Sequence, residues 1–173
     1  MKRPKPKAHS PKPGLSHVDE AGRVRMVDVG GKSETAREAV ARGRIVVGAA
    51  ALRAIRAGKV TKGDPLQTAR LAGILAAKKT SDLIPLCHPL QLSHVDVEIT
   101  RAKNGYVIES RVRTTGRTGV EMEALTAVAV AALTIYDMLK ALDKTMVIGE
   151  ICVMEKRGGR SGEYRRKAQV DSR

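Results

Sequence analysis

The sequence predicts an α+β fold: a ferredoxin-like two-layer sandwich, in which helices pack on one face of a mainly antiparallel sheet. Two segments of alternating apolar and polar residues, 95–100 and 106–114, flank Asn104-Gly105, a pair typical of a tight hairpin turn. Residues 118–142 form a long segment that is apolar on most helical faces and contains six alanines. A hairpin and a helix of this kind bury their apolar faces against each other, which favours two layers.

The first part of the chain predicts one strand and one ambiguous segment. Residues 24–29 alternate with a period of two and stop at Gly30-Gly31, as a strand does before a turn. Residues 35–47 begin with helix-forming Ala and Glu and end in Ile-Val-Val. Only the end of this second segment is therefore predicted to be extended.

Two helices are predicted before the hairpin, and one strand after the long helix. Residues 49–57 have the apolar spacing of a short helix that a glycine ends. Asp64 is a typical N-cap with Pro65 at the first helical position, which predicts a second helix to about residue 79. Residues 146–155 are predicted to form the last strand.

The segment Leu83–Leu90 is apolar but irregular. Its two prolines exclude a helix interior and a central strand. Its backbone polar groups therefore need partners outside a regular ladder. A Pro-bounded loop of this kind is a common place for functional side chains.

The net charge of +14 is concentrated at the two ends of the chain. Residues 1–25 and residues 156–173 each carry seven Lys or Arg and two acids, so the 130 residues between them carry only +4. The Pro- and Lys-rich start cannot bury enough apolar surface to fold. We therefore expect a disordered basic arm over residues 1–23, one domain over 24–165 and a disordered basic tail over 166–173.

Composition also limits the compartment and the chemistry. Two cysteines are too few for a disulfide framework, and no apolar run follows the basic start as in a secretion signal. No apolar run reaches the roughly 20 residues that span a bilayer. These features predict a cytoplasmic protein that does not enter membranes.

The long helix carries charged residues that one small-molecule site cannot share within one chain. Glu123 and Asp137 are 14 residues apart, which places them about 40° apart around the axis but roughly 21 Å apart along it. Lys140 lies one turn beyond Asp137. Either these side chains are solvated or salt-bridged, or they belong to different sites, or a second subunit brings one to the other.

Cys87 and His88 admit several interpretations. A zinc site is disfavoured because no second ligand pair exists in the sequence, and adjacent side chains rarely form a nucleophilic dyad. Cys87 is interpreted as a packed apolar residue. His88 is either a core histidine that bonds a backbone carbonyl or a functional group on a rigid loop. Two glycine-flanked basic turns, around Lys62 and over residues 156–162, are candidate anion sites.

Several stretches, in this order along the chain, resemble molybdenum cofactor biosynthesis protein C, the family of cyclic pyranopterin monophosphate synthases. They cover roughly residues 24–165 and are Met26–Val29, Lys62–Asp64, Asp82–Leu90, Thr118–Ala127, Leu133–Met138, Met146–Gly149 and Gly158-Gly159. The resemblance implies a lyase of the phosphorus–oxygen type. Its implied substrate is (8S)-3′,8-cyclo-7,8-dihydro-GTP, and its products are cyclic pyranopterin monophosphate and pyrophosphate. It also implies a ferredoxin-like homohexamer, a trimer of dimers, with active sites between subunits.

The resemblance carries roles to individual residues. The implied catalytic residues are Asp137, Lys140, His88 and Lys62. The implied substrate-binding residues are Leu86, Cys87, His88, Met122, Glu123, Glu121, Arg37, Lys156 and Arg160. This sequence departs from the family pattern at Gly30-Gly31 and at Arg160, where a lysine is common. No cofactor and no metal are implied, and whether Mg²⁺ accompanies the triphosphate is open because no acidic cluster marks a site.

Two other classes of protein fit the sequence less well than the enzyme. A basic nucleic-acid-binding module fits the pI of about 10.2, but most of the excess charge lies on the arms and there is no Phe or Trp for base stacking. A purely structural oligomer leaves the charges on the long helix unexplained. No specific nucleic acid partner is therefore expected.

Overall fold

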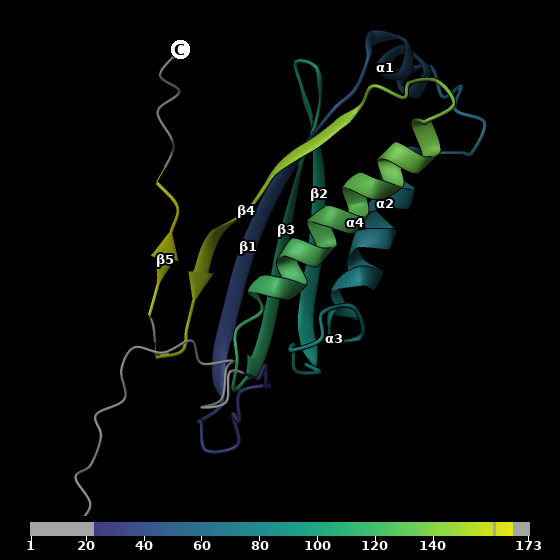
Figure 1. The fold of residues 1–173 in the computed structure, drawn as a ribbon. Helices are drawn as coiled ribbons and strands as arrows, with labels where there is room; N and C mark the ends of the chain where they lie inside the picture. Colours follow the sequence, from purple (N-terminus) through teal and green to yellow (C-terminus); the bar gives the residue numbers. More distant parts are fainter. Residues whose placement is uncertain (1–22, 161, 168–173) are drawn as a thin grey trace, which may run out of the picture.

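The computed structural model describes residues 23–160 and 162–167, and this part of the chain forms an α+β sandwich with an antiparallel five-stranded sheet in the order β2-β3-β1-β4-β5. The strands are β1 Thr35–Val46, β2 Leu92–Ala102, β3 Gly105–Gly116, β4 Val147–Arg157 and β5 Tyr164–Arg165. The helices are α1 Ala49–Arg56, α2 Pro65–Ala77, α3 Thr80–Leu83 and α4 Glu121–Leu139. Figure 1 shows α2 and α4 running side by side along one face of the sheet. The predicted two-layer fold class is confirmed.

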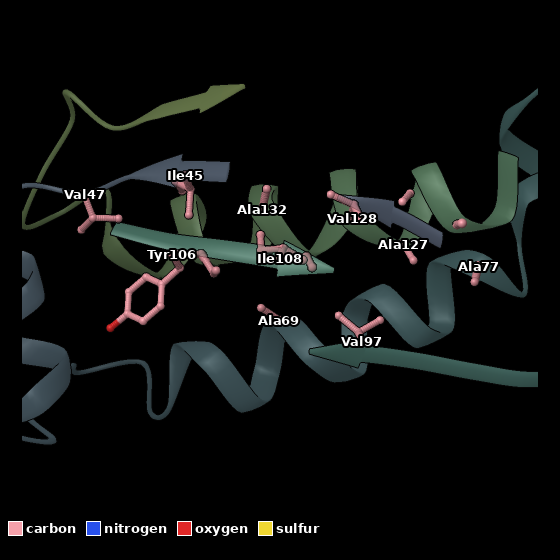
Figure 2. Close-up of a cluster of buried hydrophobic side chains, with 14 of the residues drawn as sticks. Ile45, Val47, Ala69, Ala77, Val97, Tyr106, Ile108, Ala127, Val128 and Ala132 are labelled. Carbon is pink, nitrogen blue, oxygen red and sulfur yellow. The ribbon is translucent and has the colours of Figure 1, made fainter. Parts of the chain in front are cut away.

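The core lies between α4 and the central strands, and small residues let the two layers approach closely. Ala39 and Ala41 of β1 are fully buried, and a Cβ on Gly43 would lie 2.6 Å from a methyl of Val128 on α4. Ser110 of β3 donates a buried hydrogen bond of 2.7 Å to the carbonyl of Ala124. Figure 2 shows Val128 and its alanine neighbours on α4 beside the central strands. The short distance between α4 and the sheet therefore depends on small residues at the contact.

The hairpin and the second helix begin where the sequence predicts. Gly105 has a φ of 149°, and a Cβ there would lie 1.9 Å from the carbonyl oxygen of Ile45, so only glycine fits this turn. The Asp64 side chain accepts hydrogen bonds from the amides of Leu66 and Gln67 at 2.9 and 3.1 Å, which caps α2. The predicted α1 and β4 are also confirmed.

The prediction of a strand over residues 24–29 is wrong. Val24 forms only an isolated bridge, and the remainder is irregular. The Asp28 side chain instead accepts a hydrogen bond of 2.7 Å from the amide of Gly30, which bends the chain away from an extended path. The segment does not pair with the following strand in the chain, because β3 and β4 flank β1 on both sides.

Other boundaries differ from the sequence prediction. β1 is extended over all twelve residues, including the part rich in helix formers. α4 is shorter than the predicted 118–142, while α3 and β5 were not predicted. The predicted arm and tail fall largely outside the described residues, so their boundaries remain predictions. α4 is long and apolar enough to cross a membrane, but half of it is buried inside this fold, as expected of a core helix.

Candidate functional site

At the C-terminal end of α4, the Asp137 carboxylate lies between two ammonium groups. The Nζ of Lys62 is 2.7 Å from one carboxylate oxygen, and the Nζ of Lys140 is 2.7 Å from the other. Hydrogen bonds from Lys140 and then from Lys62, together with their charges, lower the pKa of Asp137 to about 2. The bond to Asp137 in turn raises the pKa of Lys140. The cluster therefore presents a permanent carboxylate that holds two protonated amines, all of them about half exposed to solvent.

Local structure places these three side chains together. Lys140 follows Asp137 by three residues on one helical face, and cations are favoured at a helix C-terminus. Lys62 lies in the turn before the capped start of α2, and its Nζ also donates to the backbone carbonyl of Asp137 at 3.0 Å. The contact between α2 and α4 thus fixes the approach of Lys62.

At the opposite end of α4, a cavity of about 170 Å³ lies between the Pro-bounded loop and the first turn of the helix. Its lining residues are Cys87, His88, Leu90, Thr118, Gly119, Glu121, Met122 and Glu123. The structure therefore brings together five of the residues that the family resemblance implies for substrate binding. Leu86 adjoins them in the chain but does not line this cavity.

Glu123 is the buried titratable group of this cavity, with only 4% of its surface exposed. Burial, with a smaller contribution from the charge of Glu121, raises the pKa of Glu123 to about 6. A carboxyl with such a pKa can both donate and accept a proton near neutral pH. Burial and the Glu123 charge also raise the pKa of the Cys87 thiol, which keeps it neutral and fits a packing role rather than a nucleophilic one.

His88 is half-buried beside Glu123. Its Nε2 lies 2.8 Å from the backbone carbonyl oxygen of Val27, in the irregular segment that precedes β1. The contact with a backbone carbonyl that one interpretation expected is present, whereas a functional role for His88 remains a prediction. The ring bonds a backbone carbonyl, and it also lines the cavity.

A larger cavity of about 630 Å³ adjoins the first, and the two share Thr118, Gly119 and Glu121. Six of its lining residues are basic and two are acidic. The basic residues are Lys32, Arg37, Arg117, Lys156, Arg157 and Arg160, and the acidic ones are Glu38 and Glu121. This excess of cations suits a polyanion such as a phosphate chain.

Arg37 and the glycine turn after β4 shape this cavity together. The Arg37 guanidinium donates to the backbone carbonyls of Gly116 and Arg117 at 2.9 and 3.2 Å. A Cβ on Gly159 would lie 2.2 Å from that guanidinium, and one on Gly158 would lie 2.2 Å from the carbonyl oxygen of Ala36. Both glycines also have positive φ angles. Their lack of side chains is therefore needed for Arg37 to reach the loop that leads into α4.

The two ends of α4 cannot form one site in one chain. Fourteen residues separate Glu123 from Asp137 within the continuous helix, which is roughly 21 Å along its axis. The sequence prediction that these groups are too far apart for one copy is thus confirmed by the unbroken helix.

Comparison with known proteins identifies the family. The profile of the MoaC family matches residues 26–159, which covers both ends of α4. The chain belongs to the MoaC family. It is similar to the cyclic pyranopterin monophosphate synthase of Heliobacterium modesticaldum, with 61% identity over 88% of this chain and 98% of the relative. The similarly named proteins of Chloroflexus aggregans and Novosphingobium aromaticivorans are 62% and 60% identical, over 88% and 87% of this chain and 94% and 96% of theirs.

Within this MoaC chain, the structure adds residues that sequence reasoning did not assign to the site. Lys32 and Arg117 line the larger cavity. Arg157 lines it too, and it lies in the turn over residues 156–162 that the sequence already indicates as a candidate anion site. Lys32 and Arg117 each adjoin a glycine, and that pattern was the available signal. It was too weak on its own, because most glycine-flanked cations in proteins are ordinary turn residues. The individual roles that the resemblance implies remain predictions.

Proposed function

We propose that this chain is a cyclic pyranopterin monophosphate synthase of molybdenum cofactor biosynthesis, a phosphorus–oxygen lyase that converts (8S)-3′,8-cyclo-7,8-dihydro-GTP to cyclic pyranopterin monophosphate and pyrophosphate. Family membership supports the reaction. The main structural support is that the two ends of α4 carry different groups. The end at Glu123 has a buried carboxyl beside a cavity lined by cations, and the end at Asp137 has a carboxylate paired with lysines.

The larger cavity is the proposed place of the triphosphate. Lys156 lies 3.6 Å from Glu121 and Arg37 is fixed by backbone carbonyls, so both cations are held before the substrate arrives. Cations held in place stabilise the charge that develops as pyrophosphate leaves. We propose that these side chains neutralise the phosphates without a resident metal ion. The purine-derived ring then lies in the adjoining cavity beside Glu123 and His88.

The Asp137 cluster is the proposed source of protons. Opening one ring and closing another requires proton donors and acceptors rather than a redox cofactor. Lys140 and Lys62 are protonated donors, and the Asp137 carboxylate fixes the direction of both ammonium groups. Asp137 therefore acts by positioning the two amines and stays ionised throughout.

A second copy of the chain completes the proposed site. The outer face of α4 is an apolar stripe of Met122, Ala129 and Leu133 that ends at Asp137, and Leu133 is 58% exposed. Residue 130 is the midpoint between Glu123 and Asp137. A twofold antiparallel contact of α4 centred there covers the stripe and brings the Asp137 cluster of one copy to Glu123 of the other. This pairing is the repeating unit of the proposed hexamer, a trimer of such dimers.

Pyrophosphate release from the cyclic dihydro-GTP tests the proposal. Asp137→Asn keeps the shape of the side chain but removes the charge that holds both ammonium groups, so we expect kcat to fall at least a hundredfold with little change in KM. The matched control is Asp96→Asn, which breaks a surface pair with Arg70. Retained turnover in Asp137→Asn would refute the assignment. No turnover in the wild type, with DNA binding that survives physiological salt, would favour the nucleic-acid-binding alternative.

A further inference from the structure

The irregular segment before β1 lines the larger cavity and contacts His88, a lining residue of the smaller one. We call residues 24–33 the N-terminal strap. The carbonyl of Val27 contacts the ring of His88, and four residues later Gly31, Lys32 and Ser33 line the larger cavity. Two turns hold the strap in shape: the Asp28 side chain accepts from the amide of Gly30, and the amide of Lys32 donates to the carbonyl of Val29 at 3.0 Å. The strap is therefore a built element.

The contact with Val27 decides which nitrogen of His88 carries a proton. A backbone carbonyl oxygen can only accept a hydrogen bond, so Nε2 must be the donor over the observed 2.8 Å. Nε2 then keeps its hydrogen in the neutral ring and in the imidazolium alike. Nδ1 is left as the nitrogen that gains and loses a proton.

The loop that carries His88 is itself restrained. Pro85 and Pro89 restrict the backbone around His88, and the amide of Cys87 donates to the carbonyl of Ile84 at 3.0 Å. These restraints fix the backbone that carries the ring, and the bond to Val27 holds the ring itself through Nε2. Because Nε2 bonds Val27 and His88 lines the cavity beside Glu123, Nδ1 is the ring nitrogen that we assign to the substrate.

We propose that the N-terminal strap fixes His88 in the Nε2–H form through the Val27 carbonyl and so assigns proton exchange with the substrate to Nδ1. The strap is thereby a positioning element of the reaction, and Val27 acts through its backbone. The catalytic part of this inference, proton exchange between Nδ1 and the substrate, rests on the proposed function. The form of the ring, however, can be measured without any turnover.

Nitrogen-15 NMR of the histidine rings in the full-length chain tests the proposal. The sequence has four histidines, and a His88→Gln variant assigns the signals of His88. In alkaline solution, where imidazole is neutral, we expect the Nδ1–H form of His88 to be at least fivefold less populated than that of the exposed His94. Equal populations in the two rings would overturn the proposal.

A backbone substitution tests whether the strap is the cause. Replacing Asp28 by its α-hydroxy acid turns the Val27–Asp28 amide into an ester, whose carbonyl is a weaker acceptor. We expect the Nδ1–H population of His88 to rise about fivefold, the ratio that corresponds to a typical net hydrogen bond. The matched control is the ester one bond earlier, between Met26 and Val27, which should leave His88 unchanged.

The outcomes separate the two proposals. If the Val27 ester leaves the His88 populations as in the wild type, the strap does not fix the ring and this inference fails. If the ring behaves as expected but the wild type releases no pyrophosphate, only the proposed function fails. In an active enzyme, the Val27 ester should lower kcat several-fold and shift its pH profile, whereas the Met26 ester should do neither.

Discussion

The buried carboxyl of Glu123 gives the protein a pH-dependent cost in stability that a single substitution removes. Burial raises the pKa of Glu123 from 4.5 to about 6. The folded chain therefore binds this proton more tightly than the unfolded chain does. Stability is lost as the pH rises from about 4.5 through about 6, and the full cost is present above that range. Glu123→Gln keeps the size of the side chain and has no such titration.

The magnitude follows from the pKa difference. A shift of about 1.5 pKa units corresponds to about 2 kcal/mol at pH 8, and to less than about 1 kcal/mol at pH 5, where the unfolded carboxyl is only partly ionised. The stability of Glu123→Gln relative to the wild type should therefore increase by about 1 kcal/mol between these two pH values. For a chain of this length, the melting temperature of Glu123→Gln relative to that of the wild type should therefore be about 3 °C higher at pH 8 than at pH 5.

Thermal unfolding of both proteins at one fixed concentration, near pH 5 and near pH 8, measures this change. The control is Glu98→Gln, which removes a carboxylate from the exposed surface of β2. The control should follow the wild type at both pH values. If the difference between Glu123→Gln and the wild type is the same at both pH values, then burial does not raise the pKa of Glu123, and the conclusion that this carboxyl can exchange a proton near neutral pH loses its basis.

Three further results are expected. Gly73→Ala should destabilise the protein by about 1–3 kcal/mol, because the new Cβ would lie 2.8 Å from the carbonyl oxygen of Ala127 on α4, whereas Gly149→Ala, with open space around it, should not. Asp143→Ala should cost about 1–2 kcal/mol in urea unfolding, because its carboxylate accepts from the amides of Gly48 and Thr145. The hydrogen bond from the Thr145 hydroxyl, and then these two amide bonds, lower the pKa of Asp143, so the cost should be present at neutral pH and disappear as the pH falls below 3.8. Removal of divalent ions with EDTA should leave pyrophosphate release within about twofold, since held cations surround the proposed triphosphate site; complete loss, restored by Mg²⁺, would contradict this.

The fold was predictable where local signals and packing agree. Asn104-Gly105 and the Asp64-Pro65 start are strong signals because only a few residue types fit such turns and caps. β1 shows the limit. Its alanines read as helix formers, yet they lie in a central strand because α4 needs small residues beneath it. That requirement comes from a helix about 90 residues later in the chain, so no local pattern contains it.

The sequence predicts which residues belong to the candidate site, but only part of how these residues are arranged in space. The rise of a helix alone separates Glu123 from Asp137 along the axis, and the unbroken α4 keeps them apart. Neither spacing nor composition shows that Lys62 reaches Asp137, because that contact depends on how α2 packs against α4. The contact of His88 with Val27 was unpredictable for a similar reason. It joins residues 61 positions apart through a segment whose alternation predicted a strand.

Complementation between two inactive variants tests the shared site most directly. His88→Gln damages one end of α4 and Asp137→Asn the other, so each variant alone should be inactive. After co-refolding in equal amounts, half of the dimers contain one copy of each variant, and one of the two sites in such a dimer has both ends intact. Pyrophosphate release should therefore return to about a quarter of the wild-type rate. If the mixture stays as inactive as its components, while the two chains demonstrably assemble together, both ends act within one copy and the shared site is refuted.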